Sequence, residues 1–271
     1  MKVLIASIAA SGIVRVRAEL IGELINRGYE VAAVVPRSAD YKKMEDIGCR
    51  GIDVKIQQYG KNPLSDYRVY RQYIKILKDE RPDIVLLFTT KPNVYCGMAC
   101  RKLNIPAIMN ITGMGSALGS KSFTQKILIS LYRIACGGKN MRRILFQNED
   151  SRDFFKRNRI GKESVYKCIP GSGVNLEKFD LQPFPVSDTV DFLFIARIMK
   201  LKGIDEYIAA AEKVREKHPE AVFHVLGSSD DEHYKELLSE KNKSGTVVWH
   251  GRVDNIPDFE KMSQCTVQPS Y

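Results

Sequence analysis

Several kinds of residue are scarce or absent in this chain of 271 residues. All four histidines lie at or after position 218, so the first 170 residues contain no imidazole base. The six cysteines form no C-x-x-C pair, which disfavours a zinc site, and with no secretory signal at the start we expect reduced thiols. The longest fully apolar runs hold five residues, far short of the roughly 20 that cross a membrane.

Two nucleotide-binding signatures are also missing. The small-residue segment from Ser7 to Gly12 follows the first apolar run, but it does not read G-x-G-x-x-G, and the chain has no Walker A sequence. A dinucleotide-binding or P-loop function therefore has little support. The acidic run at positions 230–232 is typical of a capped helix start, and we expect no metal site.

Acidic residues are absent from Ile84 to Asn148, a segment with nine basic residues. Residues 1–170 carry 30 Lys and Arg against 15 Asp and Glu, whereas residues 171–271 carry 12 against 17. A basic half suggests an anionic partner, which would be nucleic acid, an acidic membrane or a phosphorylated substrate. Nucleic acid is disfavoured because the basic segment lacks interleaved aromatic residues that stack on bases.

The sequence does contain a regular alternation of strand and helix patterns. Apolar strand-type runs followed by amphipathic stretches predict an α/β fold with doubly wound parallel sheets. We expect a first domain at 1–170, a linker at 171–189 that holds Pro183 and Pro185, and a second domain at 190–271. Only four strands are expected in the second domain, which we therefore interpret as truncated.

The most informative stretch runs from Phe192 to Ala210. An apolar strand ends at Arg197, and a helix opens at Lys202 and Gly203. Two cations beside a helix start form an anion site, and such turns lie at the ligand-binding edge of an open α/β sheet. A solvated basic loop is the alternative.

Further candidates follow the next strands of the second domain. Gly227 directly follows a strand, where its backbone could approach a nucleotide or simply make an ordinary turn. His250 ends a strand and precedes Gly251 and Arg252, which places it at the ligand edge or in a packing role. In the first domain, the helix around 123–135 combines apolar residues with Lys121, Lys126 and Arg133. It is either a membrane-surface helix or a helix packed on its own sheet.

The ordered set of these motifs resembles glycosyltransferase family 4 along the whole chain. The motifs are Phe-Leu-Phe-Ile-Ala-Arg197, Lys202-Gly-Ile-Asp, Val-Leu-Gly227, His-Gly251-Arg, Gln-Pro-Ser-Tyr271 and the interdomain segment Ile169-Pro-Gly-Ser-Gly-Val-Asn. The resemblance implies a GT-B architecture of two Rossmann-like domains, with the acceptor mainly on the first and a nucleotide sugar mainly on the second. It also implies retaining transfer from a UDP-sugar, without metal or other cofactor.

The resemblance assigns roles to individual residues. Arg197 and Lys202 match the pair that neutralises the leaving diphosphate, which needs fixed positive charge. Gly12 corresponds to a flexible glycine turn that faces the donor. Gly203, Gly227, His250, Gly251 and Arg252 are the other donor-side candidates, and Lys91, Asn93, Thr112 and Gly113 are the acceptor-side candidates.

The acceptor-side stretches Thr90–Asn93 and Asn110–Gly115 resemble a branch that acts in bacterial capsule and surface-polysaccharide synthesis. Two departures are expected to matter: the first domain lacks the family's histidine, and the Glu-x7-Glu segment should begin after Tyr271. We interpret the chain as a cytoplasmic hexosyltransferase with a lipid-linked or polysaccharide acceptor, in contact with the inner face of the cytoplasmic membrane. The alternative is a non-catalytic fragment that binds acceptor or membrane, and we expect no transfer by these 271 residues alone.

Overall fold

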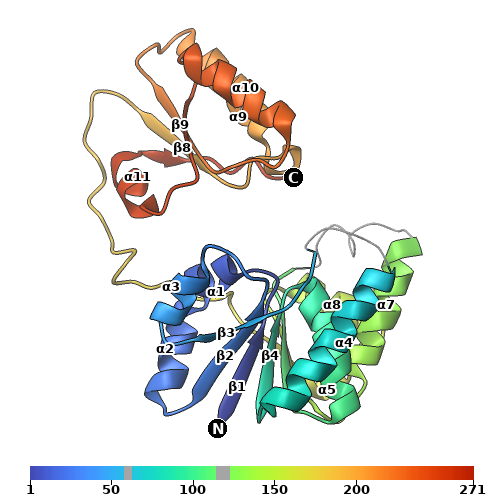
Figure 1. Ribbon diagram of the computed structural model, residues 1–271. Helices are drawn as coiled ribbons and strands as arrows, with labels where there is room; N and C mark the ends of the chain where they lie inside the picture. The colour runs from blue at the N-terminus through green and yellow to red at the C-terminus, as the bar shows by residue number, and fades with distance from the viewer. Residues whose placement is uncertain (58–62, 114–122) are drawn as a thin grey trace. The chain divides into compact units, whose positions relative to one another are not determined.

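The computed structural model describes residues 1–57, 63–113 and 123–271 (Figure 1). The chain divides into two compact units, Met1–Gly173 and Val174–Tyr271. Each unit has its own parallel sheet and its own apolar core. The expected α/β class with two doubly wound parallel sheets is confirmed.

The first unit is built on a seven-stranded parallel sheet with the order β3-β2-β1-β4-β5-β6-β7. The strands are β1 (Lys2–Ala6), β2 (Glu30–Val35), β3 (Arg50–Asp53), β4 (Ile84–Phe88), β5 (Ala107–Ile111), β6 (Met141–Phe146) and β7 (Tyr166–Cys168). The strand order reverses between β1 and β4, which pair directly with Leu86 beside Ile5. Such a reversal opens a crevice at the carboxyl ends of the two strands.

Helices cover both faces of this sheet. They are α1 (Ala10–Val16), α2 (Ala18–Asn26), α3 (Tyr41–Asp46), α4 (Pro63–Glu80), a π-helical turn η1 (Pro92–Cys96), α5 (Gly97–Leu103), α7 (Phe123–Cys136), α8 (Glu149–Arg157) and a 3₁₀ turn η2 (Glu163–Val165). One buried cluster joins the sheet to α4, α5 and α7, and a second joins it to α1, α2 and α3 (Figure 1). The strands are apolar on both sides because both faces are covered.

The amino-terminal edge of the first sheet is held by ion pairs. Glu80, at the end of α4, accepts hydrogen bonds from Arg50 at 2.6 and 3.1 Å and lies 2.6 Å from Lys2. These cations hold the pKa of the Glu80 carboxyl down, at about 2, with the Arg50 hydrogen bond as the largest cause. Ion pairs thus close the edge opposite to the strand ends that bind ligands in this kind of sheet.

The second unit has a four-stranded parallel sheet with the order β10-β9-β8-β11. Its elements are β8 (Asp191–Ile195), a 3₁₀ turn η3 (Lys200–Lys202), α9 (Ile204–Arg215), β9 (Val222–Leu226), α10 (Glu232–Lys243), β10 (Val248–Gly251), α11 (Ile256–Met262) and β11 (Cys265–Thr266). Phe194 and Phe223 face α9 and α10 in an apolar core. Asp191 and His224 alternate with them and therefore lie on the opposite face.

The segment between β1 and β2 forms two helices, α1 and α2, which meet at Arg17. Among the helices in the described ranges, none is both long enough and apolar enough to cross a lipid bilayer.

Candidate functional site

The strand order of the second sheet reverses at β8, which pairs with β9 on one side and β11 on the other. Ligands bind outside the carboxyl ends of the strands at such reversals. A cavity of about 140 Å³ lies there, lined by Phe194, Ile195, Ala196, Lys202, Gln268 and Ser270. These residues come from the end of β8, the η3 turn and the segment after β11. The structure therefore places Lys202 in a cavity at the carboxyl edge of the strands.

Backbone contacts fix the turn that carries Lys202. Gly203 has a φ of +73°, a left-handed conformation that glycine adopts without strain. A Cβ at this position would overlap the carbonyl oxygen of Pro269. The amide of Tyr271 donates to the carbonyl of Leu201 at 3.3 Å, and the Tyr271 hydroxyl donates to Glu206. The segment after β11 thus fixes the Lys202 turn by packing against Gly203 and by hydrogen bonds to Leu201 and Glu206.

A second glycine draws the strand ends together. Gly227 follows β9 with a φ of +139°, and a Cβ there would overlap the carbonyl oxygen of Ala196. Its amide donates to the carbonyl of Gly251 at 2.7 Å, and its carbonyl accepts from the indole N–H of Trp249 at 2.9 Å. Gly227 is therefore required for the close approach of β8, β9 and β10 beside the cavity.

The other predicted donor-side cations are exposed at the same edge. Arg197 follows Ala196, which lines the cavity, but the Arg197 side chain itself is not part of the lining. Gly251 has a φ of +67°, and Arg252 after it is exposed. The cavity thus assembles Lys202 with the end of β8, whereas Arg197 and Arg252 flank that edge from neighbouring turns.

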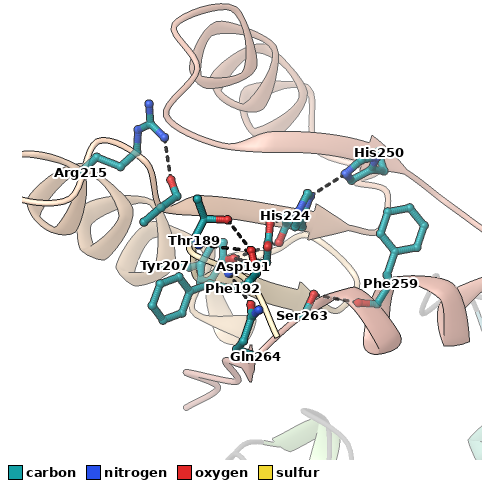
Figure 2. A network of polar contacts seen from close by, with 12 residues as sticks. Thr189, Asp191, Phe192, Tyr207, Arg215, His224, His250, Phe259, Ser263 and Gln264 are labelled. Carbon is teal, nitrogen blue, oxygen red and sulfur yellow. Dashed lines mark hydrogen bonds and ion pairs between the residues drawn. The ribbon is translucent and has the colours of Figure 1, made fainter. Parts of the chain in front are cut away.

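A buried polar chain crosses the second sheet on the face covered by α11 (Figure 2). Asp191 Oδ1 lies 3.1 Å from His224 Nε2, and His224 Nδ1 lies 3.0 Å from His250 Nε2. His224 is 6% exposed, and the ring of Phe259 from α11 packs edge-on against His250 at 4.7 Å between centroids. This chain of polar side chains starts at Asp191, the first residue of β8, and ends at His250, near the carboxyl end of β10.

The chemistry of the three groups sets the direction of the chain. A carboxylate can only accept, so His224 donates from Nε2 to Asp191, and in the neutral form of His224 its Nδ1 accepts. His250 then donates from Nε2, which fixes its tautomer. Burial lowers the pKa of His250, with the neighbouring His224 as a smaller cause. The sequence singled out His250 alone and missed Asp191 and His224, although a histidine inside the apolar strand Val222–Leu226 was an available signal.

The acceptor-side candidates lie at the carboxyl ends of β4 and β5. Lys91 forms a largely buried ion pair with Asp66 of α4 at 3.0 Å. Asn93 is buried in η1, and its amide nitrogen donates to the carbonyl of Asn110 at 3.0 Å. Thr112 and Gly113 are exposed directly after β5. The structure thus brings Asn93 and the Thr112 segment to one edge, while Lys91 joins η1 to α4.

The glycine turn predicted at Gly12 is wrong. Gly12 lies in the first turn of α1, not in a glycine turn, and the nearest atom to a Cβ there would be Ser7 Oγ at 4.0 Å. The helix begins at Ala10 because the small residues after β1 fit against the sheet, with Ala10 and Ile13 buried. Nothing in this conformation requires glycine.

Family comparisons divide the chain as the fold does. The model described as Glycosyltransferase Family 4 matches residues 10–170, and the model described as Glycosyl transferases group 1 matches residues 177–271. The chain belongs to glycosyltransferase family 4. Its activity is therefore that of a glycosyltransferase, as the motifs of the second unit implied.

Curated relatives of this family 4 glycosyltransferase are bacterial transferases. The N,N'-diacetylbacillosaminyl-diphospho-undecaprenol alpha-1,3-N-acetylgalactosaminyltransferase of Campylobacter jejuni is 26% identical over 292 residues, covering 100% of this chain and 75% of the relative. The UDP-Gal:alpha-D-GlcNAc-diphosphoundecaprenol alpha-1,3-galactosyltransferase of Escherichia coli is 22% identical over 275 residues, covering 96% of this chain and 70% of the relative.

Solved structures share the fold at low identity. Anabaena HepE in complex with UDP-glucose has a TM-score of 0.76 and 14% identity over 100% of this chain and 74% of that one. Sucrose-phosphate synthase from Thermosynechococcus elongatus has a TM-score of 0.72 and 14% identity, over 100% and 76%. This likeness confirms the expected GT-B fold class.

Proposed function

We propose that this glycosyltransferase moves a hexose-type sugar from a UDP-sugar to a lipid-linked acceptor in surface-polysaccharide synthesis. The observation that carries the proposal is Lys202 in the cavity at the β8 strand reversal. A diphosphate leaving group develops negative charge, and a fixed cation there lowers the barrier. The relatives from Campylobacter jejuni and Escherichia coli, which are named for diphosphate-linked undecaprenol acceptors, support the choice of acceptor.

The remaining roles follow the same proposal. Arg197 acts with Lys202 on the diphosphate, and Gly203, Gly227, His250, Gly251 and Arg252 shape the donor side. Transfer proceeds with retention and needs no metal or other cofactor, which predicts that EDTA leaves the rate unchanged. Asn93, Thr112 and Gly113 belong to the acceptor side, with Lys91 holding η1 in place through Asp66.

Replacement of Lys202 tests the donor assignment. In a version of the enzyme that carries out transfer, assayed with UDP-GalNAc, UDP-Gal and UDP-Glc and a diphosphate-linked lipid acceptor, Lys202→Ala should lower turnover about 10²-fold. The matched control is Lys200→Ala, which removes an exposed cation of the same turn that does not line the cavity. Equal rates for wild type and Lys202→Ala would refute the assignment.

A membrane contact is the second part of the proposal. On α7, Phe123, Ile127 and Ile134 are 78%, 47% and 44% exposed, and Lys126 is exposed beside them. Apolar side chains flanked by cations are typical of helices that lie on acidic lipid surfaces. We therefore place the protein in the cytoplasm, at the inner face of the cytoplasmic membrane.

Vesicle binding tests this contact. The sequence analysis also named Lys121, which lies outside the described residues, and Arg133, whose Nε donates to the carbonyl of Asn158 at 2.8 Å. Lys126→Glu combined with Phe123→Ser avoids that packing contact and should reduce cosedimentation with phosphatidylglycerol vesicles severalfold at low salt. Lys213→Glu on α9 serves as the charge-matched control, and equal binding by both variants would contradict a contact through α7.

A further inference from the structure

A buried cation that the sequence analysis did not single out lies at the strand reversal of the first sheet. Arg17 occupies the break between α1 and α2 and is 9% exposed. Its guanidinium carbon lies 4.2 Å from the ring centroid of Phe88, the last residue of β4. β4 pairs with β1 at the reversal, so Arg17 lies at the carboxyl edge where open α/β sheets bind ligands.

The charge of Arg17 is not compensated within the protein. Among the residues that the structure describes, none accepts a hydrogen bond from its guanidinium or forms an ion pair with it. Burial lowers its pKa, and no neighbouring charge opposes this effect. The Phe88 ring offers a cation–π contact, but a ring face supplies no protein hydrogen-bond acceptor for the five N–H donors of the guanidinium.

We propose that Arg17 binds a phosphoryl group of a substrate diphosphate. The planar guanidinium fork matches two phosphate oxygens, and a buried cation without a counter-ion binds an anion strongly. The ligand supplies the negative charge and the hydrogen-bond acceptors that the protein does not. This inference rests on the proposed function, because nucleotide sugars and lipid-linked sugars are the diphosphates that it brings to the protein.

Two diphosphates share this chemistry. One is the nucleoside diphosphate of the donor, and the other is the diphosphate that links the acceptor sugar to its lipid. The two sources can be separated with soluble probes: UDP represents the donor, geranyl diphosphate represents the acceptor linkage, and inorganic diphosphate represents the bare anion.

The test compares binding of these probes to wild type, Arg17→Met and Arg17→Lys by calorimetry. Arg17→Met keeps the apolar stem over Phe88 but removes the charge, and should bind at least one diphosphate probe roughly tenfold to a hundredfold more weakly. Arg17→Lys should fall between, because an ammonium lacks the planar fork. Arg27→Met is the control, since Arg27 is exposed and paired with Glu23 at 2.7 Å on the same helix.

Thermal stability separates binding from a structural role. If Arg17 serves a ligand, unliganded Arg17→Met should melt no lower than wild type, because it loses an uncompensated buried charge. Inorganic diphosphate should raise the melting temperature of wild type but not of Arg17→Met. If Arg17 only packs on Phe88, Arg17→Met should melt lower and bind every probe like wild type, and that result overturns the proposal.

The binding results distinguish failure of the Arg17 proposal from failure of the proposed function. A loss confined to geranyl diphosphate assigns Arg17 to the acceptor, and a loss for UDP assigns it to the donor. If UDP binds neither wild type nor Lys202→Ala while Arg17→Met still loses geranyl diphosphate, the donor proposal fails and the Arg17 site stands. If wild type binds none of the three probes, the Arg17 site is overturned.

Discussion

The two units use the same strand–helix alternation but cover their sheets differently. The first sheet has an apolar cluster on each face. The second has an apolar cluster on the α9–α10 side, whereas a chain of Asp191, His224 and His250 occupies the α11 side. Apolar burial stabilises in proportion to area, while a buried polar chain adds little net stability but enforces a single arrangement. The comparison predicts a stable first unit and a more specific, less stable second unit.

The largest change in the relative stability of the two units is expected from a substitution at Gly227. Gly227→Ala should destabilise the second unit by roughly 3–5 kcal/mol, because a Cβ overlaps the Ala196 carbonyl and φ is unfavourable. Gly245→Ala is the control, because Gly245 has a φ of +74° but open space around it. It should lose only the backbone strain energy of a non-glycine residue at positive φ, about 1–2 kcal/mol. The single tryptophan, Trp249, reports unfolding of the second unit by fluorescence, while circular dichroism reports both units.

A large shift of the fluorescence midpoint in urea, with an unchanged circular dichroism transition for the first unit, would show that the units unfold separately. A joint shift of both signals would contradict the separate-unit interpretation.

The polar chain offers a sharper test of specificity. Asp191→Ala leaves the Nε2–H of His224 buried without its acceptor, which should cost about 1–3 kcal/mol of second-unit stability. Asp191→Asn keeps an acceptor oxygen and should retain most of that stability. Nitrogen chemical shifts of the imidazoles should show His224 and His250 both protonated at Nε2 in wild type, and a mixture of tautomers in Asp191→Ala.

The matched control for the polar chain is Glu220→Ala. Glu220 accepts from His218 at 3.3 Å in an exposed pair, so its loss should leave second-unit stability within about 0.5 kcal/mol. Equal losses of stability at Asp191 and Glu220 would mean that the buried hydrogen bond of Asp191 stabilises the second unit no more than an exposed pair does.

The smallest effect is expected at the amino-terminal edge of the first unit. The folded pKa of Glu80 is depressed from 4.5 to about 2, so its stabilising contribution is present above pH 4.5 and is lost as the pH falls toward 2. Glu80→Gln should cost about 1 kcal/mol at pH 7 and flatten this acid dependence. Acid titrations of circular dichroism for both proteins check this, and parallel curves would count against the ion pairs.

Sequence alone predicted the regular parts of the fold. The apolar run Phe192–Ala196 and the helical spacing after Gly203 correspond to β8 and α9, because strand and helix periods follow directly from side-chain burial. The same stretch predicted a cation at the edge of the sheet, and Lys202 lines a cavity there. Local pattern and tertiary environment agree in this region.

Where long-range contacts decide, sequence reasoning was incomplete. Gly12 looked like a turn residue, but packing of Ala10 and Ile13 on the sheet begins the helix earlier. Asp191, His224 and His250 are separated by 33 and 26 positions, and only strand register brings them together. Arg17 had no distinguishing signal, since an arginine in an amphipathic pattern usually lies in solvent.

The backbone contacts around Gly203 also set the order in which a newly made chain matures. Lys202 reaches its cavity only when Pro269 fills the space beside Gly203 and Tyr271 bonds to Leu201. Synthesis from the N-terminus at 5–20 residues per second makes these partners roughly 3–14 s after the turn itself. The first unit, with Arg17 at its reversal, has already been translated before that interval begins. The nascent enzyme therefore acquires its first sheet before the cavity that holds Lys202.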